Sequence, residues 1–94
     1  KKLNLKKYGL TLKEYDDLYK FQNGCCALCG MHERHFNRAL HVDHNHRNGK
    51  VRGLLCFDCN TGLGKFYDDP ELLRAAIRYL DLNGFYVPEI SNKE

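Results

Sequence analysis

Two Cys-x-x-Cys pairs stand out in this chain, Cys26/Cys29 and Cys56/Cys59. Two pairs at this spacing are typical of a site in which four thiolates hold one zinc ion. Such a closed shell leaves no position for water or substrate, so the ion would stabilise the fold and take no part in a reaction. Disulfides are the alternative. The five cysteines are an odd number, however, and no segment resembles a signal peptide, which favours an intracellular chain with a spare thiol at Cys25.

Asp43, His44 and Asn60 offer a second kind of chemistry. Carboxylate and amide oxygens, as in Asp43 and Asn60, are hard ligands that suit Mg²⁺ or Mn²⁺. Histidine exchanges protons near neutral pH, so His44 is the natural general base. A zinc ion bound by both cysteine pairs would draw these three residues together from distant parts of the sequence. Phosphodiester hydrolysis needs a base that activates water, a divalent cation that neutralises the developing charge and a group that stabilises the leaving oxygen.

Other interpretations of these residues stay open. An Asp-His dipeptide is common, and His41, His44 and His46 could be surface histidines or a loose metal-binding cluster. Neighbouring strand residues point to opposite faces, so Asp43 and His44 share one site only where the strand bends. The chain could therefore be a non-catalytic, zinc-stapled DNA-binding module. A zinc-built protein-interaction domain is a third alternative.

Basic residues are concentrated in two stretches. The first twenty residues hold six lysines against three acidic residues, and residues 31–52 hold five lysines and arginines against two. The net charge of the whole chain is +3. This distribution favours a phosphate-bearing partner such as DNA, and a solvated basic surface is the alternative. No apolar run approaches the length needed to span a membrane.

Two strands and a helix must position the candidate residues, and their boundaries can be predicted. Hydrophobic alternation indicates strands, and Asn-Gly is a strong hairpin signal. Glycines at 62 and 64 disfavour a helix, so we expect close packing there or a ligand close to the backbone. The predicted elements are a strand over 39–44, a turn at Asn48-Gly49, a strand over 51–55 and a helix from about 58–60 to 66.

Flanking helices are predicted on either side. Thr11 and Glu14 form a capping-box pattern that begins a helix ending at Gly24. Asp69-Pro70 is a typical start for the last helix. That helix has an apolar stripe, predicted to be buried, of Leu73, Ala76, Ile77 and Leu80, and 85–87 should pack back as an extended tail. The prediction is one α+β domain over 1–94, divided into a basic arm and first helix (1–24), a zinc-stapled core (25–66) and a C-terminal helix and tail (67–94).

In its two cysteine pairs and in the segments around Asp43-His44 and Asn60, the chain resembles the recombination endonuclease VII branch of the HNH, or ββα-metal, nucleases. The resemblance covers nearly all of the chain beyond about Tyr8. The matching motifs are Cys-Ala-Leu-Cys-Gly at 26–30, Leu-His-Val-Asp-His-Asn-His at 40–46, Gly-Lys-Val-Arg-Gly-Leu-Leu-Cys at 49–56 and Cys-Asn-Thr-Gly-Leu-Gly at 59–64.

The resemblance implies a metal-dependent DNA endonuclease with a zinc-stapled ββα-metal fold and one catalytic Mg²⁺ or Mn²⁺. Asp43 and Asn60 would bind that ion, and His44 would activate water. In-line attack on phosphorus would leave a 5′-phosphate and a 3′-hydroxyl. Position 63 is leucine here, whereas some members of the family have a carboxylate one turn after the asparagine.

Further expectations concern the substrate and its surroundings. The side chains expected to contact phosphate are His46, Lys50 and Arg52. No asparagine stands between Lys50 and Cys56 to orient the catalytic histidine, so a backbone carbonyl or another group must do so. We expect nicking or double-strand cutting with low sequence specificity, in the cytoplasm of a bacterial or phage-infected cell. Branch-cutting members of the family are dimers, which leaves monomer and homodimer both open here.

Overall fold

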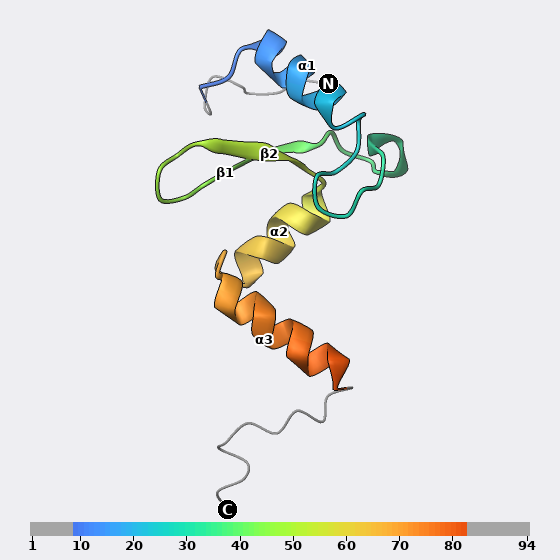
Figure 1. The fold of residues 1–94 in the computed structure, drawn as a ribbon. Helices are drawn as coiled ribbons and strands as arrows, with labels where there is room; N and C mark the ends of the chain where they lie inside the picture. The colour runs from blue at the N-terminus through green and yellow to red at the C-terminus, as the bar shows by residue number, and fades with distance from the viewer. Residues whose placement is uncertain (1–8, 83–94) are drawn as a thin grey trace, which may run out of the picture. The chain divides into compact units, whose positions relative to one another are not determined.

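The computed structural model describes residues 9–82, which form helices and one small sheet. The chain divides into two compact units, 1–62 and 63–94, and the elements that surround the cysteines belong to the first. The predicted α+β class is confirmed. Residues 1–8 of the predicted basic arm, and the predicted tail over 85–87, lie outside the described residues. In order, the elements are α1 (Leu12–Phe21), η2 (Glu33–His35), β1 (His41–His44), β2 (Val51–Leu55), α2 (Phe57–Lys65) and α3 (Pro70–Asp81) (Figure 1).

The first helix begins as its capping box predicts. Thr11 Oγ1 accepts a hydrogen bond from the Glu14 backbone N–H at 3.1 Å, and Glu14 Oε1 accepts one from the Thr11 N–H at 2.8 Å. The helix ends at Phe21, before the predicted Gly24. Asn23 and Gly24 both have positive φ angles, which reverse the chain toward the first cysteine pair.

Two side-chain contacts hold α1 against the start of β1. Tyr15 is 5% exposed, and its hydroxyl donates to the Leu40 carbonyl at 3.0 Å. Glu33, on η2, accepts hydrogen bonds from the Tyr19 hydroxyl and the Leu40 N–H. The Leu40 N–H is therefore used outside the sheet, and β1 begins at His41 instead of the predicted residue 39. The buried apolar and cysteine side chains are Tyr15, Cys26, Leu40, Val42, Leu54, Leu55 and Cys56.

The predicted hairpin is confirmed, and its turn is closed by Asn45 and Lys50. The Asn45 N–H donates to the Lys50 carbonyl at 2.8 Å, and Asn45 Oδ1 accepts from the backbone N–H groups of Arg47 and Asn48. Gly49 has a φ angle of +74°, which a side chain would disfavour. The asparagine side chain thus organises the turn between β1 and β2.

The segment that carries the first cysteine pair packs along the edge of β2. Gln22 Nε2 donates to the Leu54 carbonyl at 2.9 Å, and Gln22 Oε1 accepts from the Leu54 N–H at 2.9 Å. The Ala27 N–H also donates to the Leu54 carbonyl, at 3.0 Å. A Cβ atom at Gly53 would lie 3.2 Å from Gln22 Oε1, so a small residue suits that position. These hydrogen bonds join the segment before the first cysteine pair to the strand that leads into the second pair.

The helices after β2 differ from expectation in two ways. A Cβ at Gly62 or Gly64 would meet no atom within 4 Å, so close packing does not explain these glycines in the described structure. The start of α3 is as predicted, with Asp69 accepting from the Glu71 N–H at 2.9 Å. The prediction of a buried apolar stripe on α3 is wrong. Ile77 is 57% exposed because no described element of residues 63–82 covers that face, and Leu80 is exposed in the same way.

Candidate metal centre and active site

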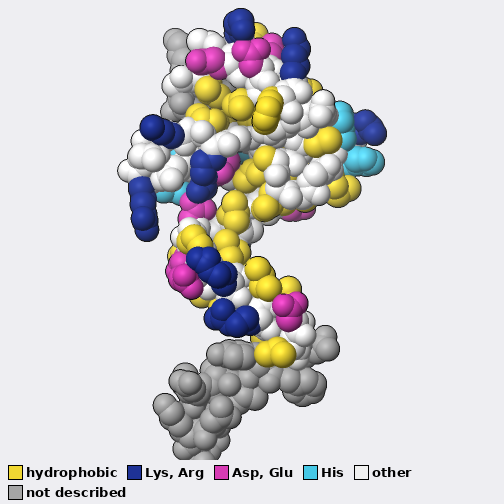
Figure 2. Space-filling model, viewed as in Figure 1, with side chains coloured by type: hydrophobic (Ala, Val, Ile, Leu, Met, Phe, Trp, Pro, Cys, Tyr) yellow, Lys and Arg dark blue, Asp and Glu magenta, His cyan; other side chains and the backbone are white. Residues whose placement is uncertain are grey.

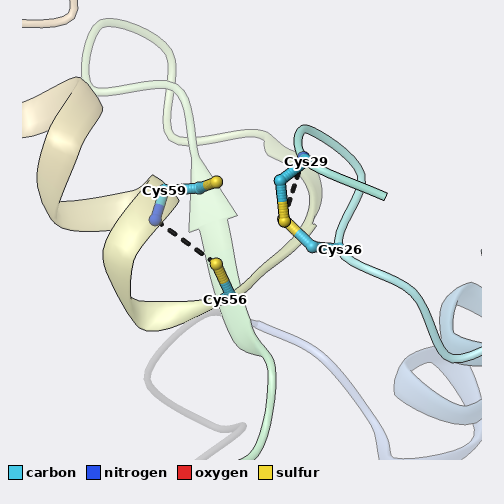
Figure 3. A group of neighbouring side chains, drawn as sticks. All are labelled: Cys26, Cys29, Cys56 and Cys59. Atoms are coloured by element: carbon cyan, nitrogen blue, oxygen red, sulfur yellow. Dashed lines mark hydrogen bonds between the residues drawn. The ribbon is translucent and has the colours of Figure 1, made fainter. Parts of the chain in front are cut away.

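The four paired cysteines converge in space, as their spacing predicts. Their sulfur atoms all lie within 4.8 Å of one another. Figure 3 shows one pair coming from the loop after α1 and the other from the start of α2. The Cys29 N–H points at the Cys26 sulfur at 3.5 Å, and the Cys59 N–H points at the Cys56 sulfur at 3.4 Å. Each pair therefore forms a tight turn whose backbone donors face sulfur.

The cysteine cluster fits a tetrahedral metal ion. Sulfur atoms bound to one zinc at about 2.3 Å lie roughly 3.8 Å apart, which is compatible with the observed grouping. Four soft thiolates are a donor set that selects zinc or an iron–sulfur cluster. Cys26 and Cys56 are each 2% exposed, so half of the donor set is shielded from solvent. Cys25 lies outside the cluster, and its thiol faces the Asn23 carbonyl at 3.5 Å.

The thiol pKa values within the cluster are shifted from those of ordinary cysteines. Burial opposes ionisation of Cys26, but backbone N–H groups of Cys29, Cys56 and Leu28 lower its pKa to about 6. Burial and the neighbouring thiols raise the pKa of Cys59. Cys26 is therefore easier to ionise than an ordinary cysteine, and Cys59 is harder to ionise. Metal binding at such a site releases protons and depends on pH.

Asp43 is a buried carboxylate with an arginine partner. It is 8% exposed, and the Arg52 guanidinium bonds to both of its oxygens, with Nε–Oδ2 at 2.8 Å and Nη2–Oδ1 at 3.1 Å. The predicted metal ligand and one predicted phosphate contact thus bind each other. A buried carboxylate requires such a counter-ion, because a lone charge in this position is strongly unfavourable.

The pairing between β1 and β2 is irregular beside the candidate catalytic residues. Asp43 pairs with Gly53, whereas His44 pairs with Val51, so the register shifts between the two candidate residues. Strand side chains alternate between faces, and an irregularity of this kind re-aims them. The His44 ring lies 4.8 Å from the His46 ring, centroid to centroid, at an interplanar angle of 55°. His46 is therefore a neighbour of the candidate base.

Asn60 lies in the first turns of α2 and is half-buried. The Phe57 and His41 ring centroids are 5.8 Å apart, which joins the start of the helix to the start of the strand. Asn60 follows Phe57 by three positions and shares its helix face, and Asp43 follows His41 by two and shares its strand face. Within residues 9–82, no hydrogen bond links the side chains of Asp43 and Asn60.

Basic side chains gather on the hairpin. Arg47, Lys50 and Arg52 are exposed, as is His46, and Figure 2 shows dark blue side chains over this part of the molecule. Sequence reasoning missed the pairing of Arg52 with Asp43, although opposite charges on adjacent strands are a known stabilising pattern. It also missed Arg38, whose guanidinium carbon lies 3.9 Å from the centre of the Phe57 ring.

Taken together, the hairpin, the following helix and the cysteine cluster define a small α+β domain with four clustered cysteines suited to a metal ion and an Asp-His motif on its first strand. The chain belongs to the recombination endonuclease VII family, whose family model matches residues 1–82. It is 46% identical over 74 residues to the Gene 59 protein of Mycobacterium phage D29. It is 45% identical over 74 residues to the Gene 59 protein of Mycobacterium phage L5. Each match covers 78% of this chain and 44% of the relative, so the chain spans less than half the length of these relatives.

Within residues 9–82, no helix has both the length and the apolar character that crossing a bilayer requires.

Proposed function

We propose that residues 1–94 form the nuclease domain of a metal-dependent DNA endonuclease that acts in a phage-infected bacterial cell. The domain would nick or cut DNA with low sequence specificity. Membership of the recombination endonuclease VII family supports the reaction class. The register shift at Asp43 and His44 is the observation that carries the proposal, because the extra residue Arg52 on β2 disrupts the regular pairing beside the two neighbouring side chains that must serve one site.

In this proposal the four clustered cysteines hold a structural zinc ion. The zinc would join the loop after α1 to the start of α2. The hydrogen bonds of Gln22 and Ala27 to Leu54 already hold the first of these segments against β2. Zinc and hydrogen bonds would together fix the hairpin relative to the first turns of α2. A rigid frame of this kind is what a catalytic site needs from its scaffold.

Catalysis is assigned to the residues on the hairpin and helix. Asp43 and Asn60 would supply the oxygen ligands of one Mg²⁺ or Mn²⁺, which neutralises charge at the scissile phosphate when bound. His44 would accept a proton from the attacking water. Attack in line with the scissile bond would break the link from phosphorus to the 3′ oxygen and leave a 5′-phosphate and a 3′-hydroxyl. His46, at 4.8 Å from His44, would support the base or contact the phosphate.

One observation favours a second candidate function. Both oxygens of Asp43 are engaged by Arg52. A domain with a permanently paired Asp43 would bind DNA through its basic hairpin without cutting it. The two candidate functions differ in whether the protein breaks a phosphodiester bond with His44 as the base.

A plasmid assay separates these candidates. Zinc-loaded protein is mixed with supercoiled DNA and Mg²⁺ or Mn²⁺, and His44→Ala is compared with His35→Ala, a change at an exposed histidine on η2. We expect His35→Ala to nick like the wild type and His44→Ala to bind DNA without nicking, a loss of at least about a hundredfold. Equal nicking by His44→Ala would remove His44 as the base. Binding without nicking by the wild type in both ions would favour the non-catalytic module.

A further inference from the structure

Arg52 occupies the position that a divalent cation would need on Asp43. We propose that Arg52 is a built-in counter-ion that holds Asp43 in the metal-free protein and competes with the catalytic cation for the same carboxylate. Arg52 thereby sets the affinity of the metal site and becomes free to meet DNA phosphate when the cation binds. This inference rests on the proposed function, because it takes Asp43 to be a metal ligand.

The geometry of the pair supports competition. Both carboxylate oxygens accept a guanidinium N–H, at 2.8 and 3.1 Å. A cation that binds either oxygen would lie close to a guanidinium that already holds both oxygens in a fork. A guanidinium that stayed in place would also repel the cation. Pairing with Arg52 and binding of a metal are thus alternative states of Asp43.

The Asp43 and Arg52 side chains differ in exposure, as replacement of Arg52 by a cation on Asp43 requires. The Asp43 side chain is 10% exposed, whereas that of Arg52 is 37% exposed. The carboxylate is fixed and shielded, so it needs a positive partner at all times. The arginine has the longer and more exposed side chain, so it is the partner expected to move when a cation binds.

The register shift explains how Arg52 reaches Asp43. The paired positions on β2 are Gly53 and Val51, so Arg52 is the extra residue between them. In a regular ladder Arg52 would pair with His44 and share its face, which is opposite to that of Asp43. The shift re-aims Arg52, and Gly53, directly opposite Asp43, has no side chain to block it. The same register shift thus lies beside Asp43 and His44 and brings Arg52 to Asp43.

Manganese titration of zinc-loaded protein without DNA tests the inference. Free Mn²⁺ is followed by electron paramagnetic resonance for the wild type, Arg52→Gln, Arg52→Lys and Arg47→Gln. Arg47→Gln makes the same charge change on an exposed residue of the same hairpin. We expect Arg52→Gln to bind Mn²⁺ about tenfold more tightly than the wild type, and Arg47→Gln to stay within about twofold of it. Arg52→Lys keeps the charge but loses the fork and should lie between wild type and Arg52→Gln.

Thermal unfolding gives a second readout that does not depend on activity. Without Mn²⁺, Arg52→Gln should melt at a lower temperature than Arg47→Gln, because Asp43 is left buried without a partner. Saturating Mn²⁺ should raise the midpoint more for Arg52→Gln than for the wild type. An affinity of Arg52→Gln equal to or weaker than that of Arg47→Gln would overturn the inference. If Arg52→Gln does not fold, the same comparison with Arg52→Lys decides.

Asp43→Asn separates failure of the inference from failure of the proposed function. If Asp43→Asn loses Mn²⁺ binding while both Arg52 variants bind like the wild type, Asp43 is a ligand and Arg52 is no competitor. If Asp43→Asn binds Mn²⁺ like the wild type, Asp43 is not a ligand and the proposed catalytic site is itself wrong.

Discussion

The side-chain amide of Gln22 pairs with the backbone of Leu54 through two hydrogen bonds of 2.9 Å, in the manner of a neighbouring strand. The same Nε2 group also donates to the Cys25 carbonyl at 2.7 Å. One side chain therefore satisfies the edge of β2 and holds the loop that leads into the cysteine cluster. An Ala at this position would deprive the Leu54 N–H and the Cys25 carbonyl of the Gln22 amide, whereas the Leu54 carbonyl would keep its hydrogen bond from the Ala27 N–H.

Replacement of Gln22 tests this contact. Gln22→Ala should lower the free energy of unfolding of the zinc-loaded protein by about 1–3 kcal/mol, because the Leu54 N–H and the Cys25 carbonyl lose the Gln22 amide as their partner. Asn37→Ala, which removes an exposed amide, is the control and should cost less than about 0.5 kcal/mol. Denaturant unfolding measures both. Equal effects of the two changes would mean that water replaces the Gln22 amide without loss.

The cysteine cluster makes a second prediction, about metal content. Cys59→Ser should lower the bound zinc well below one ion per chain and unfold much of the domain, because the shell loses a thiolate. Cys25→Ser, outside the cluster, should keep both zinc and fold. Metal analysis of the purified proteins, together with circular dichroism, measures the outcome. A folded, zinc-loaded Cys59→Ser protein would show that the cluster does not hold the fold together.

Tyr15 gives the fold a pH dependence at alkaline pH. Burial, followed by the charge of Glu33, raises the pKa of its hydroxyl to about 12. In the unfolded chain tyrosine ionises near pH 10, so the unfolded state gains stability first as pH rises. Stability should therefore be intact below about pH 10 and fall as pH rises from there through about 12.

Tyr15→Phe isolates this effect. At pH 7 the variant should be less stable than the wild type by about 1 kcal/mol, because the hydrogen bond to the Leu40 carbonyl is lost. Above pH 10 the difference should shrink, since only the wild type can ionise at this position. Unfolding curves at pH 7, 9 and 11 measure it. Parallel decline of both proteins would assign the alkaline transition to other groups.

Much of the fold follows from local signals in the sequence. The capping box at Thr11, the start of α3 at Pro70 and the hairpin at Gly49 each depend on residues close together in the chain, so each is predictable. The cysteine cluster is also predictable, because a metal shell demands a fixed spacing within each pair. The prediction of a buried stripe on α3 was wrong because a periodic pattern predicts an apolar face but does not say what covers it.

The candidate site was less predictable, because it depends on register. A one-residue shift in β2 decides whether Arg52 faces Asp43 or His44, and no motif in the sequence marks that shift. Gln22 was missed for a similar reason, since a helix-end glutamine gives no sign that its amide will pair with a strand 32 positions away. Contacts of this kind arise from tertiary packing, which overrides local preference.

The most direct test of the whole account is a crystal of zinc-loaded protein soaked in Mn²⁺ and measured at the manganese absorption edge. The account predicts one anomalous peak within about 2.2 Å of both an Asp43 carboxylate oxygen and the Asn60 amide oxygen, with the Arg52 guanidinium moved off Asp43. An Asp43 still bonded to Arg52 at saturating Mn²⁺, with no peak between residues 43 and 60, would contradict it.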